Sequence, residues 1–259
     1  MRSEPGIAAE ISVRDQVSAE EWQLRVQLAA CYRLFAHFGM TDLIYNHITA
    51  RVPGTGHFLI NAYGLLYDEV TASNLHKIDL DGNFMLRAPG EFGINPAGYI
   101  IHSAIHGGRH DAGCVIHTHS RAATAVSAME CGLLPLSQSA MFFYGEVGYH
   151  DFEGPAVDPD ERRRLVDDLG PHDVMLLRNH GTITVGRTVP HAFLTAYQLE
   201  SACRIQVDAM AGGRLKMPPH ELCAAVPPVA RDPRFQNGSG LEWAALLRLL
   251  DRKDPGYAV

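Results

Sequence analysis

The 259-residue sequence lacks the features that mark most nucleic-acid-binding and membrane-embedded proteins. Basic residues are in the minority, with 22 Lys and Arg against 29 Asp and Glu, and a surplus of negative charge disfavours binding to a phosphate backbone. No apolar run approaches the roughly 20 residues that cross a bilayer. We therefore expect a protein that acts on neither nucleic acid nor a membrane.

Cysteine is also scarce, and its five positions are odd in number and widely spaced. This usage indicates free thiols in a reducing compartment rather than a disulfide framework. Residues 1–16 carry scattered charge and no apolar segment of the kind found in secretion signals. These features predict a cytoplasmic protein, and a hydrophobic content of 46% is enough for a full core.

The hydrophobic pattern predicts antiparallel strands first, and alternating helices and strands afterwards. A capping box at residues 18–21 begins a largely apolar helix that ends at Gly39, and hairpins follow over residues 45–61 and 75–86. A helix is expected over residues 95–106. Beyond it we expect strands over 114–119, 146–152, 173–178 and 182–185, and helices over 120–129, 158–169 and 189–210. This order predicts an α/β layered fold with a mixed sheet.

The chain divides into three parts in this interpretation. Residues 1–17 are expected to be a flexible, polar arm, and residues 18–212 a single domain. The extension over residues 213–259 contains Pro218-Pro219 and Pro227-Pro228, a composition typical of a stiff linker. An amphipathic helix over residues 239–252 ends the chain, and it could contact another subunit or pack on its own.

Three histidines stand at the ends of two apolar strands. His117 and His119 end the first, and their i, i+2 spacing puts both rings on the same side of an extended chain. About sixty residues later, His180 follows the second strand in a turn closed by Gly181. Three neutral imidazoles with an open fourth position suit a catalytic zinc or a non-haem iron. The alternative is a set of ordinary polar residues, because a chain with 14 histidines contains such spacings by chance.

Motifs in a fixed order extend from about residue 20 to about residue 212: Tyr45–Thr49, Asn61–Gly64, Asp68–Thr71, Asn95–His102, His117–His119 and Asn179–Gly181. Together they resemble the class II aldolase/adducin family. The resemblance implies a three-layer α/β/α sandwich around a mixed, largely antiparallel sheet, assembled as a homotetramer with active sites near subunit boundaries. It also implies that His117, His119 and His180 bind a divalent metal ion, zinc in the first place, with iron, manganese or cobalt as alternatives.

The sequence departs from the sugar-phosphate aldolases of that family. Their Ser-Ser-Glu segment, which binds phosphate and supplies the acid/base Glu, is replaced here by Pro96-Ala97-Gly98, and a threonine of their other phosphate loop by Tyr63. Asn46 and Gly64 of that loop remain. A phosphate with no hydroxyl, amide or cation aimed at it would be poorly held. We therefore expect a small, non-phosphorylated substrate bound by Asn46, Tyr63 and Gly64.

Because Gly98 cannot move a proton, another group must. His102 and His106 lie one turn apart on the same face of the predicted helix. His102 matches a family position without a catalytic role, so we interpret it as structural and predict His106 as the general base. Tyr144 and a metal-bound hydroxide are the competing candidates.

Three functions compete. We favour an aldolase-type lyase that forms a metal-stabilised enolate from a hydroxy-carbonyl substrate. Tyr63 and residues 142–144 (Phe-Phe-Tyr) would suit an aromatic substrate, and ordinary core positions explain them equally. A non-haem iron oxygenase on the same fold needs the same three histidines. A non-catalytic binding module like the adducin head needs no metal, and the complete histidine set argues against it because adducin-like heads lack that set.

Overall fold

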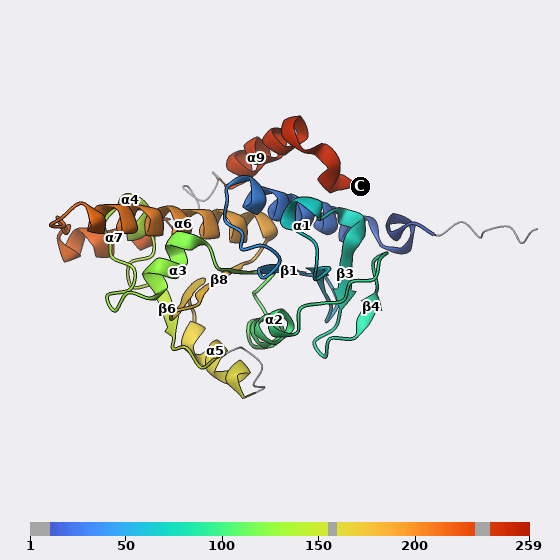
Figure 1. Ribbon diagram of the computed structural model, residues 1–259, viewed down its shortest axis with the longest axis horizontal. Helices are drawn as coiled ribbons and strands as arrows, with labels where there is room; N and C mark the ends of the chain where they lie inside the picture. The colour runs from blue at the N-terminus through green and yellow to red at the C-terminus, as the bar shows by residue number, and fades with distance from the viewer. Residues whose placement is uncertain (1–10, 155–159, 231–238) are drawn as a thin grey trace, which may run out of the picture.

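The computed structural model describes residues 11–154, 160–230 and 239–259. One sheet runs through its centre with its eight strands in the order β4-β3-β2-β1-β5-β8-β7-β6 (Figure 1). Neighbouring strands are antiparallel, apart from the parallel pair β6 and β7. The strands are β1 (His47–Arg51), β2 (Phe58–Asn61), β3 (Leu75–Ile78), β4 (Phe84–Leu86), β5 (Cys114–Thr118), β6 (Val147–His150), β7 (Val174–Leu177) and β8 (Gly181–Gly186).

Helices cover both faces of this sheet, so the predicted α/β/α sandwich with a mixed, largely antiparallel sheet is confirmed (Figure 1). One face is covered by α1 (Ala19–His37), α3 (Arg121–Ser127) and α6 (Val189–Ala211), and the other by α2 (Pro96–Gly108) and α5 (Glu161–Leu169). The last helix, α9 (Ser239–Lys253), packs on α1 and α6 through Trp243 and Leu250. It therefore docks on its own chain.

Strand β5 is buried on both faces, which explains its nearly unbroken apolar sequence. Cys114 and Ile116 point into the core beneath α1, whereas Val115 points into the core beneath α2. By the same alternation His117 faces the α2 side, at the end of the strand. The pleat of β5 thus decides which face of the sheet carries the histidines.

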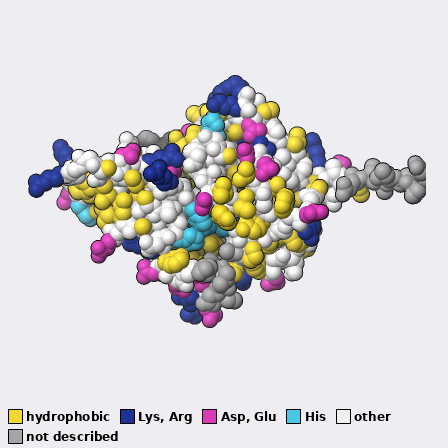
Figure 2. Space-filling model, viewed as in Figure 1, with side chains coloured by type: hydrophobic (Ala, Val, Ile, Leu, Met, Phe, Trp, Pro, Cys, Tyr) yellow, Lys and Arg dark blue, Asp and Glu magenta, His cyan; other side chains and the backbone are white. Residues whose placement is uncertain are grey.

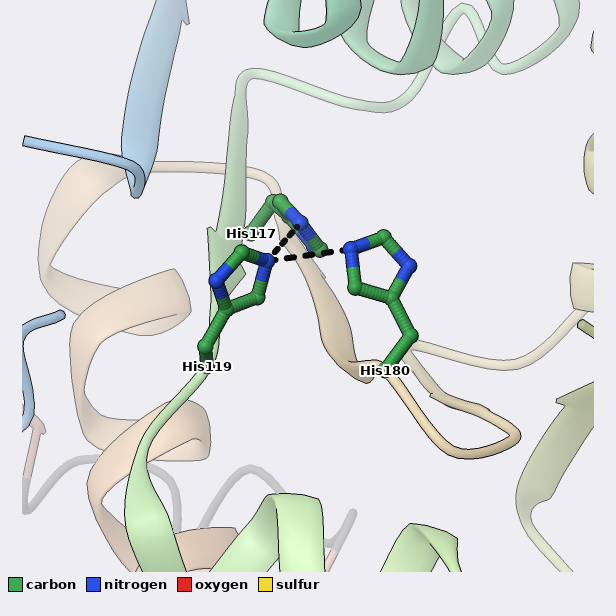
Figure 3. Close-up of side chains that lie close together, drawn as sticks. All are labelled: His117, His119 and His180. Atoms are coloured by element: carbon green, nitrogen blue, oxygen red, sulfur yellow. Dashed lines mark hydrogen bonds between the residues drawn. The ribbon is translucent and has the colours of Figure 1, made fainter. Parts of the chain in front are cut away.

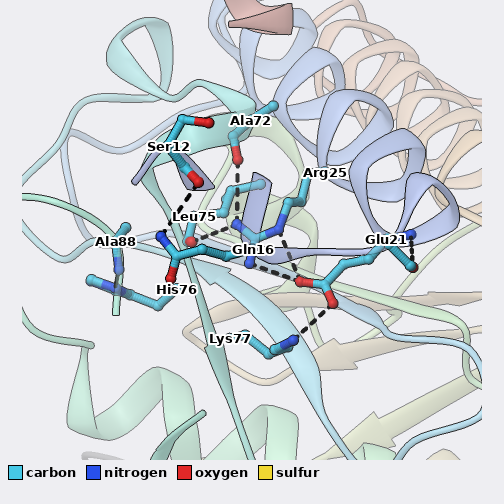
Figure 4. Close-up of polar contacts among 10 residues, drawn as sticks. Ser12, Gln16, Glu21, Arg25, Ala72, Leu75, His76, Lys77 and Ala88 are labelled. Atoms are coloured by element: carbon cyan, nitrogen blue, oxygen red, sulfur yellow. Dashed lines mark hydrogen bonds and ion pairs between the residues drawn. The ribbon is translucent and has the colours of Figure 1, made fainter. Parts of the chain in front are cut away.

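A buried ion pair joins α1 to β3 (Figure 4). The guanidinium of Arg25, which is 0% exposed, donates to Glu21 from Nε and Nη2 at 3.1 and 3.0 Å. Its Nη1 donates to the carbonyls of Ala72 and Leu75 at 3.3 and 2.8 Å, and Lys77 approaches the other Glu21 oxygen at 2.8 Å. Every polar group of this cluster is satisfied, which makes the burial of its charges tolerable.

The predicted N-terminal arm is wrong for the part that the structure describes. Residues Val13–Gln16 form the short 3-10 helix η1, and buried Val13 packs with Trp22 and Ala72. An apolar residue at position 13 is enough to hold this segment against the domain. Residues 1–10 of the predicted arm lie outside the described residues.

The predicted Pro-rich linker is also wrong, because α7 (His220–Ala230) occupies much of it. The carbonyl of Pro219 accepts hydrogen bonds from the backbone of Leu222 and Cys223. A proline directly before a helix costs it no hydrogen bond, because the first amides of a helix have no partner within it. Pro227 and Pro228 lie in its final turns, and the Cys223 side chain is buried. A second short helix, α4 (Gln138–Met141), contacts α7 and was not predicted.

Among the described residues, no helix is both long enough and apolar enough to span a bilayer.

Candidate metal centre

Three imidazoles converge at one end of β5 (Figure 3). His117 lies near the end of β5, His119 directly beyond it, and His180 in the turn between β7 and β8. The Nε2 atom of His119 is 2.9 Å from that of His117 and 3.0 Å from that of His180. Within the described residues, this is the group of histidine, cysteine and acidic side chains whose geometry could hold a metal ion.

Hydrogen bonds at the far side of two rings fix which nitrogen faces the centre. Nδ1 of His117 lies 3.0 Å from the carbonyl of Thr182, and Nδ1 of His119 lies 3.1 Å from a carboxylate oxygen of Asp42. Because both partners can only accept, both Nδ1 atoms carry the proton and both Nε2 atoms present bare lone pairs. Two lone pairs only 2.9 Å apart repel each other unless a cation lies beside both.

Protonated imidazole is a poor candidate for that cation. Burial, followed by the nearby His47, His180 and His119, holds the pKa of His117 well below its usual value. Burial and the neighbouring His119 lower the pKa of His180 to about 4. The rings of His117 and His180 are therefore neutral near pH 7, and imidazoles with converging Nε2 atoms form a donor set that fits a divalent metal ion.

The turn that carries His180 has no room for a larger residue at position 181. A Cβ atom on Gly181 would lie 2.4 Å from the backbone oxygen of Thr118 and 3.1 Å from Cδ2 of His119. Asn179, the residue before His180, has a positive φ of 58°. Close approach of this turn to β5 is what brings His180 to the other two histidines.

Asp42 contacts one of the three histidines, and the sequence analysis did not identify it. Its backbone amide donates to Oδ1 of Asn46 at 2.7 Å, which fixes the loop that presents its carboxylate to His119. The side chain of Thr118 donates to the carbonyl of Met40 at 2.8 Å and ties the same loop to β5. No sequence signal pairs Asp42 with His119, because 77 residues separate them.

The predicted substrate residues are only partly brought together. Asn46 is 1% exposed, and its Nδ2 has no hydrogen-bond partner among the described residues. Tyr63 donates from its backbone amide to Gly93, and Gly64, with a φ of 127°, packs under Phe92. No described contact joins Tyr63 or Gly64 to the three histidines. Their role as substrate residues stays a prediction.

The two predicted proton-transfer residues lie away from the convergent nitrogens. Tyr144 packs edge-on against His220 of α7 and lines a hollow with Leu133 and Tyr149. His106 is 0% exposed and stacks on Phe58, and burial, with a contribution from Arg51, lowers its pKa to about 3. Both of its ring nitrogens are engaged, Nε2 by Oγ1 of Thr49 at 2.8 Å and Nδ1 by Arg51 at 3.4 Å, so this placement disfavours the general-base role that we predicted for His106.

The face that carries histidine side chains is shown in Figure 2, where they gather near the middle, bordered by hydrophobic side chains. The side chain of His119 is 21% exposed, whereas His117 is buried. The convergent Nε2 atoms therefore lie at the edge of the interior, within reach of a small molecule.

The sequence and the fold were compared with known proteins. The model of the Class II Aldolase and Adducin N-terminal domain matches residues 26–207. Rat alpha-adducin is 50% identical over 190 residues, which are 73% of this chain and 26% of that protein. The crystal structure of an aldolase II superfamily protein from Pseudomonas syringae is 52% identical, with a TM-score of 0.91, over 96% of this chain and 100% of that one.

A sugar-phosphate aldolase has the same fold at lower identity. L-fuculose 1-phosphate aldolase from Glaciozyma antarctica is 26% identical, with a TM-score of 0.81, over 98% of this chain and 96% of that one. The family match covers the helices and strands that carry all three convergent histidines. The chain belongs to the class II aldolase/adducin family.

Proposed function

We propose that the chain is a metal-dependent carbon–carbon lyase of the aldolase type, with His117, His119 and His180 as the metal ligands. The observation that carries this proposal is the convergence of three Nε2 atoms, two of them on rings whose Nδ1 atoms are already engaged. A bound divalent ion, zinc in the first place or iron, manganese or cobalt, would withdraw electron density from a carbonyl of the substrate.

The surrounding residues hold the ligands in place before any ion binds. The Thr182 carbonyl and the Asp42 carboxylate orient the rings of His117 and His119. Asn46 in turn fixes the backbone of Asp42. Such support raises the basicity of the ligands and reduces the reorganisation needed on binding.

The substrate that we propose is a small hydroxy-carbonyl compound without a phosphate. Gly98 stands where sugar-phosphate aldolases of the family have their acid/base Glu, and a Cβ atom there would lie only 2.6 Å from the ring of His47. The site therefore has neither that carboxylate nor space for it. We infer that Asn46 is a substrate residue, supported by its buried and unpartnered Nδ2.

The first experiment measures metal content. Purified wild type is compared with His119→Ala and with His110→Ala, which removes an exposed histidine outside the site. We expect about one ion per chain in wild type and His110→Ala and nearly none in His119→Ala. Equal metal content in all three proteins would contradict the assignment.

The second experiment separates a lyase from an iron oxygenase on the same fold. The protein is loaded with zinc or iron under anaerobic conditions and incubated with hydroxy-ketones and hydroxy-acids, with and without oxygen. Cleavage with either metal in the absence of oxygen supports the lyase. Turnover that requires both iron and oxygen would replace it with the oxygenase.

A non-catalytic binding module is the second candidate, and the identity of 50% to rat alpha-adducin favours it. Such a module keeps its partner when the metal centre is removed. Capture of one protein partner by His119→Ala and wild type alike, together with absence of metal from wild type, would support this function. Retention of all three histidines argues for the enzyme.

We also propose a cytoplasmic homotetramer. Apolar side chains are exposed along α6 and α7, among them Met210, Leu222 and Val229 at 41%, 63% and 52%. We infer that another subunit covers part of this surface. Light scattering measures the assembly directly, and a monomer mass independent of concentration would contradict the tetramer.

A further inference from the structure

A second set of histidines lies beside the metal centre without belonging to it. His47, His102 and His106 are 3%, 0% and 0% exposed. His47 is the cross-strand partner of His117 in the β1–β5 ladder, and the centroids of the two rings are 4.9 Å apart. The ring of His47 therefore stands directly next to a proposed metal ligand, on the α2 side of the sheet.

Hydrogen bonds link this set into a continuous chain through Thr49. Nδ1 of His47 is 2.9 Å from Nε2 of His102, and Nδ1 of His102 is 2.5 Å from Oγ1 of Thr49. The same Oγ1 is 2.8 Å from Nε2 of His106. Each imidazole and the hydroxyl donates once and accepts once, so the direction of one link fixes the direction of all the others.

Arg51 sets that direction at the far end. Its Nη2 approaches Nδ1 of His106 at 3.4 Å and also donates to the carbonyl of the same residue. A guanidinium can only donate, so we infer that Nδ1 of His106 accepts from Arg51 rather than donating to the nearby carbonyl of Ala112, and that its Nε2 donates to Thr49. Thr49 then donates to His102, and His102 donates to Nδ1 of His47. The chain leaves His47 with its N–H at Nε2, which has no partner among the described residues.

The ring of His47 also occupies the space that the side chain of residue 98 would need. A Cβ atom on Gly98 would lie 2.6 Å from Cδ2 of His47 and 2.8 Å from its Nε2. Contacts this close do not occur in folded proteins, so a side chain at position 98 and the present position of His47 exclude each other. The ring of His47 can therefore lie where it does only because residue 98 has no side chain.

We propose that His47, whose ring fills the space left by Gly98, is a catalytic residue that donates a hydrogen bond from Nε2 to an oxygen of the substrate held at the three histidines. The proposal rests on the proposed function, since it needs a ligand at that centre. His102, Thr49 and His106 are positioning residues, which hold the ring of His47 and keep its Nδ1 free of a proton. The class of ligand is a small molecule with two adjacent oxygens, such as a hydroxy-carbonyl compound.

The test uses the full chain loaded with cobalt(II), and acetohydroxamate as a ligand with two adjacent oxygens. Cobalt content is measured first, and binding of acetohydroxamate is then followed by the visible absorption of the cobalt. His47→Asn keeps an acceptor for His102 but removes the group at Nε2, and we expect it to weaken binding about tenfold at unchanged cobalt content. His47→Gln reaches as far as Nε2 with a donor, and it should lose less than about threefold.

A second pair of variants tests whether a side chain at position 98 displaces the ring of His47. Gly98→Ala displaces the ring and should weaken binding of acetohydroxamate as His47→Asn does. Gly107→Ala, in the same helix but with nothing within 4 Å of the added atom, is the matched control and should bind as wild type does.

The outcomes separate the two proposals. Normal cobalt content with equal affinity for acetohydroxamate in wild type and His47→Asn would overturn the role of His47 and leave the proposed metal centre intact. A wild-type protein that binds no cobalt would overturn the proposed function, and the role of His47 with it. Weaker binding in His47→Asn and Gly98→Ala, but not in Gly107→Ala, supports the proposal.

Discussion

Asp42 accepts a hydrogen bond from Nδ1 of His119 at 3.1 Å, although 77 residues separate the two along the chain. A carboxylate in this position holds the imidazole in the tautomer that leaves Nε2 free. Its own loop is tied to β5 by the bond from Thr118 to the carbonyl of Met40. We therefore expect the metal affinity of the proposed site to depend on a residue that is not itself a proposed ligand.

We predict that Asp42→Ala lowers the affinity for zinc by about tenfold to a hundredfold, the usual effect of removing such a partner. Competition with a chromophoric chelator measures this affinity. Asp111→Ala, which removes an exposed carboxylate paired with Arg109, is the control and should bind zinc as wild type does. Unchanged affinity in Asp42→Ala would show that the bond to His119 does not support the site.

Gly181→Ala should disrupt the same centre from the other side. The added Cβ atom would lie 2.4 Å from the backbone oxygen of Thr118, which cannot move without disturbing β5. We expect loss of bound metal and a lower melting temperature, measured by metal analysis and circular dichroism. Gly56→Ala, with nothing within 4 Å of its added atom, should change neither. Full metal content in Gly181→Ala would contradict the close approach of the turn to the strand.

Removal of the buried guanidinium of Arg25 should destabilise the fold. Arg25→Met leaves the Glu21 carboxylate with Lys77 alone and leaves two buried carbonyls without their donor. We expect a loss of about 3 kcal/mol in the free energy of unfolding, measured by urea denaturation. Arg163→Ala removes a side chain that is 86% exposed and should cost less than about 0.5 kcal/mol. A similar loss in both variants would mean that the buried pair contributes nothing specific.

His76 should make the fold sensitive to acid. Burial, followed by the charge of Arg87, lowers its pKa from 6.5 to about 4, and its Nδ1 accepts from the amide of Ala88 at 3.0 Å. Between pH 6.5 and about 4 only the unfolded chain takes up this proton, so the free energy of unfolding falls as pH decreases. Above that window neither state binds the proton, and below it both do.

The variant His76→Asn tests this dependence, because its Oδ1 can accept from Ala88 but cannot titrate. The free energy of unfolding of wild type should fall more steeply over this window, by up to about 1.4 kcal/mol per pH unit. Urea denaturation at several pH values gives both slopes. Parallel slopes would show that His76 titrates normally in the folded protein.

The sequence predicted those parts of the site whose geometry follows from residues that are close together in the chain. His117 and His119 are two residues apart on an apolar strand, and a strand alternates its side chains, so their common direction follows from spacing alone. The same rule, applied to the helix, placed His102 and His106 on one face. It could not show that this face is covered by β1, which buries both rings and removes His106 from the substrate side.

The residues that were missed depend on contacts between distant segments. Asp42 and His47 lie in a loop and a strand that reach the site only once β1 has paired with β5. His47 lies in the motif Tyr45–Thr49. Its close contact with Gly98, on which its proposed role depends, is visible only in the three-dimensional structure. The helix α7 was missed for another reason. The prolines at its two ends led us to interpret this segment as a linker, despite the apolar residues between them.

The register of β5 against β8, in which Thr118 lies opposite Thr182, has a consequence for how the sheet assembles. A slip of one residue would move His180 by about 3.3 Å along the strand. That displacement exceeds the 3.0 Å between its Nε2 and that of His119, so a misaligned chain could not surround one ion. If the proposed ion binds, it favours the correctly aligned sheet by mass action. An ion bound at the three histidines would then help to select the native pairing of β5 with β8 over misaligned pairings.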